Sequence, residues 1–166
     1  MSDTFTTLEE LQQNDGAQAT LRQLATVLTD EKNYHRLFDV LLMQKKLELG
    51  LPLVKPTSFD DVPEDQRTGF EKHYVESARQ VGGMLLEAGR VGDAWVYFQT
   101  IQEPGPVREA LDGLSANSDD YERTEELINV ALYEGAHPVK GLELMLNSHG
   151  TCNTITALDQ QIMQLP

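Results

Sequence analysis

The sequence predicts an all-α protein built from antiparallel helix pairs. Apolar residues recur every three or four positions along most of the chain, which is the period of a helix face buried against a core. No segment keeps the alternation of apolar and polar residues that is typical of a strand. Hydrophobic residues make up 40% and charged residues 24% of the 166 residues, an ordinary globular composition. We therefore expect a single helical domain over residues 1–166.

Three helices are expected before residue 51. The first ends near Asn14, and the second begins after a turn at Gly16. The third ends at Gly50, because glycine readily adopts the left-handed conformation found after a helix C-terminus. Its apolar stripe is the strongest of this half and consists of Tyr34, Leu37, Phe38, Leu41, Leu42 and Leu49. Residues 51–62 are rich in proline and aspartate, so we expect the longest internal loop, or a hinge, there.

Prolines and glycines divide the second half into shorter helices. Pro63 begins a long one, because its missing N–H lies among amides that are unpaired at a helix start. Gly89 ends this helix. Three more helices are expected at residues 94–102, 107–114 and 122–134.

Two further helices are expected at the C-terminal end. Pro138 begins the first, whose inward face we predict to be Leu142, Met145 and Leu146. The second starts at Thr151 and carries Ile155, Leu158 and Ile162 at helical spacing. Since the sequence ends close behind this apolar face, we expect the helical domain to continue past Pro166.

The charge of the chain indicates which partners to expect. Twenty-seven acidic and 13 basic residues give a net charge of −14, which repels phosphate backbones and anionic lipid headgroups. No stretch approaches the roughly 20 apolar residues that span a bilayer, and the N-terminal region lacks the pattern of a signal peptide. We expect a cytoplasmic protein that binds neither nucleic acid nor membranes.

Residues 75–108 carry a spacing pattern of small and apolar residues. The pattern is Ala78, Val81, Gly82 and Leu85, then Ala94 and Phe98, then Pro106. It resembles a tetratricopeptide repeat, in which two successive helices cross closely. Gly82 and Ala94 take the places of the small residues at the crossing, and Phe98 takes the place of the aromatic residue that fills the gap beside them. The early tryptophan, leucine and tyrosine positions of that family are occupied here by Ala78, Val81 and Leu85.

The resemblance implies a short array of helix pairs that binds a protein or peptide partner. Trp95 and Tyr97 are the candidate anchors for that partner, since aromatic residues dominate many interfaces. A second, weaker copy of the pattern runs through Ile128, Leu132, Gly141 and Met145. A plain antiparallel bundle with small residues at its crossings is the alternative architecture.

Residues 34–50 and 149–156 also resemble parts of a family of longer bacterial proteins of unknown activity. That resemblance implies an alternative role, in which the chain is the structural N-terminal half of a larger helical protein. The sequence leaves the oligomeric state open.

An enzyme or a metal-binding domain centred on His137, His149 and Cys152 is the alternative from another class. The simpler interpretation is that Gly150 ends one helix, Thr151 or Asn153 caps the next, and Cys152 is a small buried filler. The single cysteine excludes an internal disulfide. No glycine-rich phosphate cradle follows a strand, and the sequence predicts no cofactor.

Overall fold

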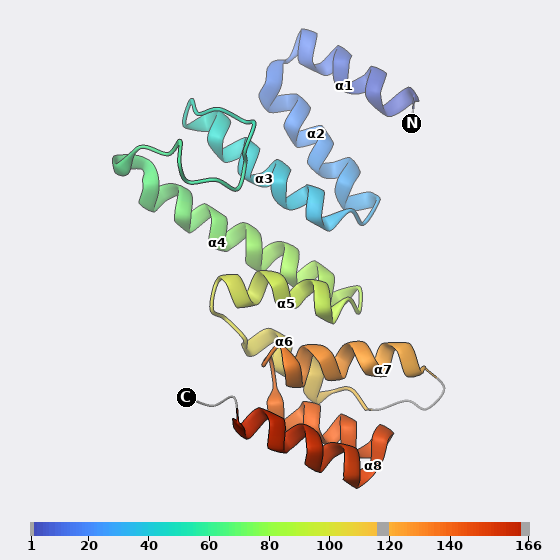
Figure 1. The fold of residues 1–166 in the computed structure, drawn as a ribbon. Helices are drawn as coiled ribbons and strands as arrows, with labels where there is room; N and C mark the ends of the chain where they lie inside the picture. The colour runs from blue at the N-terminus through green and yellow to red at the C-terminus, as the bar shows by residue number, and fades with distance from the viewer. Residues whose placement is uncertain (1, 116–119, 164–166) are drawn as a thin grey trace. The chain divides into compact units, whose positions relative to one another are not determined.

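The computed structural model describes residues 2–115 and 120–163, and this part of the chain is helical without any strand. The all-α prediction is confirmed (Figure 1). In chain order the elements are α1 (Ser2–Asn14), α2 (Gly16–Asp30), α3 (Tyr34–Glu48), α4 (Glu64–Glu87), α5 (Val91–Thr100), α6 (Gly105–Asp112), α7 (Tyr121–Ile128), the π-helix η1 (Asn129–Tyr133) and α8 (Pro138–Met163).

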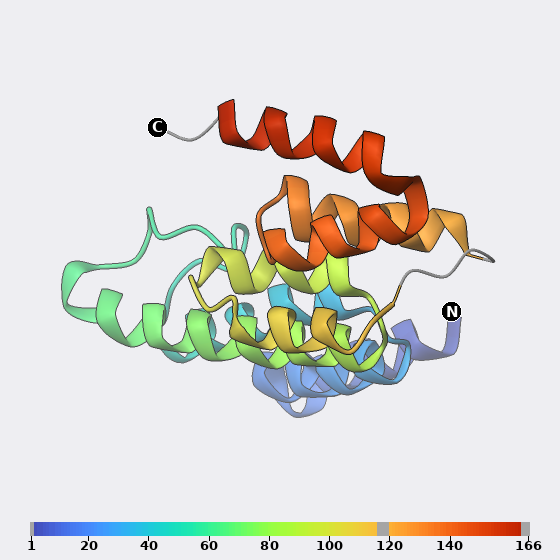
Figure 2. The ribbon, with the colours of Figure 1, turned by 90° about the horizontal axis from the view of Figure 1, so that it is seen from below.

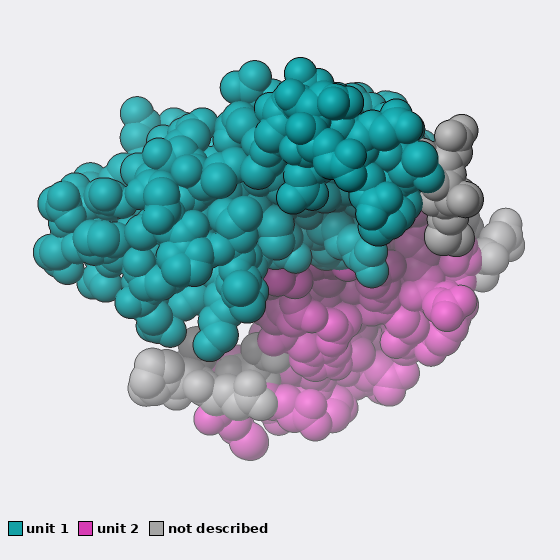
Figure 3. Space-filling view, turned by 90° about the horizontal axis from the view of Figure 1, so that it is seen from above, with its two compact units in different colours: residues 1–84 teal, residues 85–166 magenta. Residues whose placement is uncertain are grey.

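The chain divides into two compact units, residues 1–84 and 85–166, which are coloured teal and magenta in Figure 3. The boundary falls inside α4, between Met84 and Leu85. The expected loop at residues 51–62 is present and lies within the first unit. The expectation of a single domain stays a prediction.

In the first unit, α1 packs against α2 and α2 against α3. The side chain of Gln44 on α3 donates a hydrogen bond to the carbonyl of Leu21 on α2 (3.1 Å), which fixes the register of the two helices. The buried apolar side chains of this unit include Leu37, Leu42 and Phe70, which are at most 1% exposed. As predicted, α3 ends just before Gly50, which has a positive φ of 70°.

A buried lysine holds the loop at residues 51–62 against its unit. Lys46 on α3 is completely buried, and its Nζ donates to Asp61 Oδ1 and to the carbonyl of Lys55, both at 2.7 Å. The same Nζ lies 5.6 Å from the centre of the Phe70 ring, a cation–π arrangement. The paired lysine lowers the pKa of the Asp61 carboxyl, mainly through this hydrogen bond. The loop is therefore anchored at two of its residues.

In the second unit, α8 packs against α7 and η1, and α5 packs against α6, α7 and η1. Asp120 caps α7, because its Oδ1 accepts a hydrogen bond from the backbone N–H of Arg123 (3.1 Å). The predicted helix over residues 122–134 is present but ends in the π-helix η1, in which the N–H of Glu134 donates to the carbonyl of Asn129 (2.9 Å). The sequence pattern did not predict this wider turn.

Helix α8 consists of two helical pieces that meet at Gly150. This glycine has φ 77° and ψ 177°, which interrupts the helix, and Figure 2 shows the second piece folding back beside the first. The prediction that Gly150 ends one helix is confirmed. The predicted inward position of Leu146 is wrong, since its side chain is 47% exposed, whereas Leu144 is completely buried. A count of three- and four-residue spacings did not distinguish the two faces of a helix that is apolar on both.

The residues that resemble a tetratricopeptide repeat are buried with one exception. Ala78, Val81, Leu85, Ala94 and Phe98 are at most 2% exposed, Gly82 is buried, and Pro106 is exposed. The residues at the expected crossing belong to different units, because Gly82 precedes the boundary and Ala94 follows it. The described helices fit a helical repeat in general, and the finer assignment to the tetratricopeptide family stays a prediction.

Candidate partner-binding surface

The second piece of α8 exposes a stripe of aliphatic side chains. Ile155, Leu158 and Ile162 are 59%, 41% and 56% exposed, and their spacing of three and four residues places them on one face of the helix. We call these three residues the α8 stripe. Single exposed apolar residues are common on protein surfaces, but a row of large ones at this spacing is typical of a helix that packs against another element.

The other side of the same helical piece is packed, which orients the stripe. Ala157 is only 3% exposed and Thr154 is half-buried. Gly150 allows the chain to reverse, and the side chain of Asn153 donates to the carbonyl of His149 across the break (3.0 Å). The exposed stripe therefore belongs to a docked helix.

The stripe lies in a stretch of the chain that has few charges. Residues 144–163 contain one charged side chain, Asp159, although the whole chain contains 40. By contrast, residues 85–166 contain 13 acidic and four basic residues. The stripe is thus a neutral, apolar band in the more acidic unit. This scarcity of charge was the signal in the sequence that could have identified the surface.

His149 ties α7 to the end of the first piece of α8. Its Nε2 lies 3.0 Å from Glu125 Oε1, a buried oxygen, and its Nδ1 lies 2.7 Å from Ser148 Oγ. A protonated imidazole would donate to both partners. The Tyr121 ring packs beside the imidazole, with 6.0 Å between the ring centres. This arrangement explains His149 as a structural residue near the start of the stripe helix.

The three residues of the alternative enzyme or metal site do not form one cluster. Nε2 of His137 lies 3.0 Å from Asp112 Oδ1, whereas His149 pairs with Glu125. Within residues 2–115 and 120–163, no three histidine, cysteine or acidic side chains are grouped so that they could hold a metal ion. Cys152 is a free, exposed thiol, so the prediction of a buried filler is wrong. Cys152 lies in the second piece of α8, whose buried side includes Ala157.

The two predicted aromatic anchors are largely buried. Trp95 and Tyr97 on α5 are 6% and 8% exposed. The indole Nε1 of Trp95 is buried without a hydrogen-bond partner, and a buried indole N–H usually finds one. Little of either ring is accessible in this structure. Their role as partner anchors stays a prediction.

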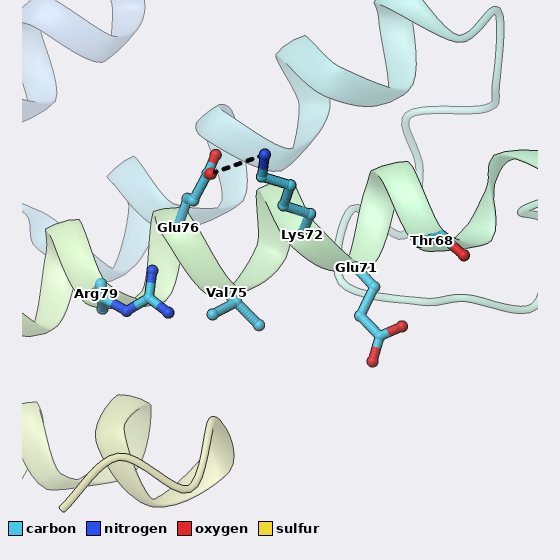
Figure 4. A pocket seen from close by; sticks show the side chains of 6 residues that line it. All are labelled: Thr68, Glu71, Lys72, Val75, Glu76 and Arg79. Carbon is cyan, nitrogen blue, oxygen red and sulfur yellow. Dashed lines mark ion pairs between the residues drawn. The ribbon is translucent and has the colours of Figure 1, made fainter.

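A surface depression of about 380 Å³ is lined by residues of α4. Figure 4 shows Glu71 and Val75 on one side of this helix and Lys72 and Glu76 on the other, while Arg79 extends along the helix. Lys72 and Glu76 form an ion pair at 4.0 Å. The two acidic and two basic side chains of the lining give it no net formal charge. Its full lining is Thr68, Glu71, Lys72, Val75, Glu76 and Arg79.

Comparisons with protein-family models, with curated proteins and with solved structures found no match to this chain. Among the helices in the described part of the chain, none is both long and apolar enough to cross a bilayer. The functional proposal therefore rests on the surface of the molecule and on the packing of its helices.

Proposed function

We propose that the protein is a non-catalytic interaction or scaffold module that binds another polypeptide through a helical surface. The observation that carries the proposal is the α8 stripe, in which three aliphatic side chains at helical spacing face outward from a docked helix. Contiguous exposed apolar surface of this kind marks sites of protein association. Trp95 and Tyr97 remain secondary candidates, which would require a partner to reach side chains that are now mostly buried.

The architecture that presents this surface supports a repeat-like array. Gly141 on α8 lies against the backbone of Leu132 in η1, so two successive helices cross closely through a small residue. Both residues belong to the weaker second copy of the repeat pattern. We propose on this basis that the helix pairs form a tetratricopeptide-like array. The family itself supplies no active site, in keeping with a binding role.

The α8 stripe alone would contribute only modestly to the free energy of binding. Fully burying an aliphatic side chain contributes about 1.5–3 kcal/mol, so three side chains that are about half exposed would together gain on the order of 3 kcal/mol. Association itself costs about 4–15 kcal/mol in lost translational and rotational freedom. A specific partner therefore needs further contacts outside the stripe.

The proposal is tested by capture of partners on the immobilised full chain from a lysate of the source cells, followed by mass spectrometry. The test variant is the double substitution Ile155→Asp and Leu158→Asp, which places charges on the stripe. Val139→Asp is the matched control, because Val139 is also aliphatic, exposed (74%) and on α8. A protein retained by the wild type and by the control, and lost with the double variant, is the expected result.

Circular dichroism must first show that the three proteins have the same helix content and thermal stability. If folded wild-type protein retains nothing that the double variant loses, the stripe is not a binding surface and the proposal is wrong.

A further inference from the structure

We infer that the segment which covers the α8 stripe is an amphipathic helix whose apolar seam is flanked by lysine and arginine. This inference rests on the proposed function, in which the α8 stripe binds a polypeptide, and it names the chemistry of that partner. Two independent observations carry it: the geometry of the stripe, and the net negative charge of its unit together with the exposed Asp159 on the same helix.

The geometry favours a helix as the partner. Ile155, Leu158 and Ile162 follow the three-and-four spacing of the inner positions of a coiled coil, and they extend over roughly 10 Å at 1.5 Å per residue. Such a row interdigitates with the side chains of a second helix that crosses at a shallow angle. A strand would instead need an exposed sheet edge with which to pair, and the described residues contain no strand.

The net charge of the unit that bears the α8 stripe favours basic flanks on a partner. The 13 acidic residues of the second unit outnumber its four basic residues, which leaves nine net negative charges. Three of the four basic side chains already have partners in the unit. Arg90 pairs with Asp93 (2.7 Å), Lys140 pairs with Glu143 (3.1 Å), and Arg108 donates to the carbonyl of Ala136 (2.9 Å).

The second piece of α8 itself carries a negative charge beside the α8 stripe. Asp159 is exposed, follows Leu158 directly and lies four residues after Ile155. Acidic flanks on a partner would meet like charges here, whereas basic flanks would be attracted and would associate faster. A second copy of this chain would bring another net charge of −14 to the same contact, so like-charge repulsion opposes self-association.

The test uses three synthetic peptides of three heptads that carry a fluorescent label. The first has leucine at the seam and lysine at the flanks, the second replaces the lysines by glutamates, and the third keeps the lysines and replaces the seam leucines by serines. Binding to the full chain is measured by fluorescence anisotropy at low and at high salt. We expect the leucine–lysine peptide to bind at least about tenfold more tightly than either of the other two, and added salt to weaken its binding, because ions screen exposed charges.

Variants of the protein separate the contribution of apolar contact to peptide binding from the contribution of charge. Leu158→Ser should weaken binding of the leucine–lysine peptide about tenfold without adding a charge, whereas Val139→Ser on the same helix should leave it unchanged. Asp159→Asn should reduce the preference for lysine over glutamate flanks. Circular dichroism of each variant shows that it remains folded.

Several results would overturn the inference. These are absence of peptide binding, equal binding of the lysine and glutamate peptides, equal binding of the serine-seam peptide, or no effect of Leu158→Ser. Concentration-dependent dimerisation in sedimentation experiments, if Leu158→Ser abolishes it, would identify a second copy as the occupant instead. Where the lysate experiment still shows a partner that depends on the stripe, the proposed function stands although this inference fails.

Discussion

Gly141 on α8 lies so close to Leu132 in η1 that a Cβ atom at Gly141 would be 2.6 Å from the Cβ and 2.7 Å from the backbone nitrogen of Leu132. Real Cβ atoms essentially never come this close to another heavy atom. The neighbouring atoms belong largely to the backbone of a buried turn, so they cannot simply rotate away. A glycine within a helix, which is normally a source of instability, is here required by the crossing of two helices.

Gly141→Ala should therefore lower the free energy of unfolding, because the added methyl group forces α8 and η1 apart. Overpacking of this kind costs roughly 1–3 kcal/mol. Gly69→Ala is the matched control, since Gly69 lies in α4 with open space around its Cβ position. The control should gain up to about 1 kcal/mol from the higher helix propensity of alanine. Urea denaturation measures both changes, and equal stability of the two variants would contradict the crossing.

The pair of Lys46 and Asp61 should respond asymmetrically to substitution. Lys46→Met keeps the aliphatic stem in place and leaves Asp61, whose side chain is 28% exposed, free to turn to water. Asp61→Ala instead leaves a completely buried ammonium group without its carboxylate. Removing one partner of a buried ion pair is far more damaging than replacing the buried charge by an apolar group. The urea midpoint of Asp61→Ala should therefore fall below that of Lys46→Met.

The same pair should make the free energy of unfolding depend on pH in the acidic range. The pKa of Asp61 is lowered in the folded protein from its ordinary value of 3.8, so the folded state favours the ionised carboxylate. This contribution is fully present above pH 3.8 and is lost as the pH falls through the lower folded pKa. The slope of stability against pH below 3.8 should decrease in Lys46→Met relative to wild type. Urea titrations at several pH values measure this slope. The same slope in Lys46→Met and in wild type would show that the ion pair is not the source of the acid dependence.

Phe98→Ala should be strongly destabilising, because the ring is only 2% exposed. Truncating a buried phenylalanine to alanine costs roughly 3–5 kcal/mol. Val96→Ala, two residues away on α5 and 57% exposed, should change stability by less than about 0.5 kcal/mol. Thermal unfolding followed by circular dichroism compares the two variants. Similar melting temperatures would mean that Phe98 does not belong to the core.

The sequence predicted the helices well because their ends depend on local chemistry. The prediction that Gly89 ends α4 is confirmed by its φ of 74° and by the hydrogen bond from the N–H of Arg90 to the carbonyl of Leu85 (2.9 Å). Pro138 begins α8 as expected, and Gly150 interrupts it. Each of these residues determines the backbone at its own position.

Features that depend on distant parts of the chain were not predicted. The contact of His149 with Glu125 joins residues 24 positions apart, and no local spacing indicates it. The burial of Lys46 was not predicted for the same reason. It requires the loop at residues 51–62 to return to α3 and to bring Asp61 within hydrogen-bonding distance of the Lys46 ammonium group. The pattern also did not show which side of the last helix would face outward, since that depends on the reversal at Gly150.

Cys152 should react with a thiol reagent in the native protein, because its side chain is exposed on the second piece of α8. One equivalent of a chromogenic disulfide reagent should be consumed without denaturant, at a rate close to that of the unfolded chain. Reaction only after denaturation would restore the prediction of a buried filler. The thiol also lies three residues before Ile155, so it reports on occupancy of the stripe. Saturation with the leucine–lysine peptide should slow the reaction several-fold, whereas the serine-seam peptide should leave the rate unchanged.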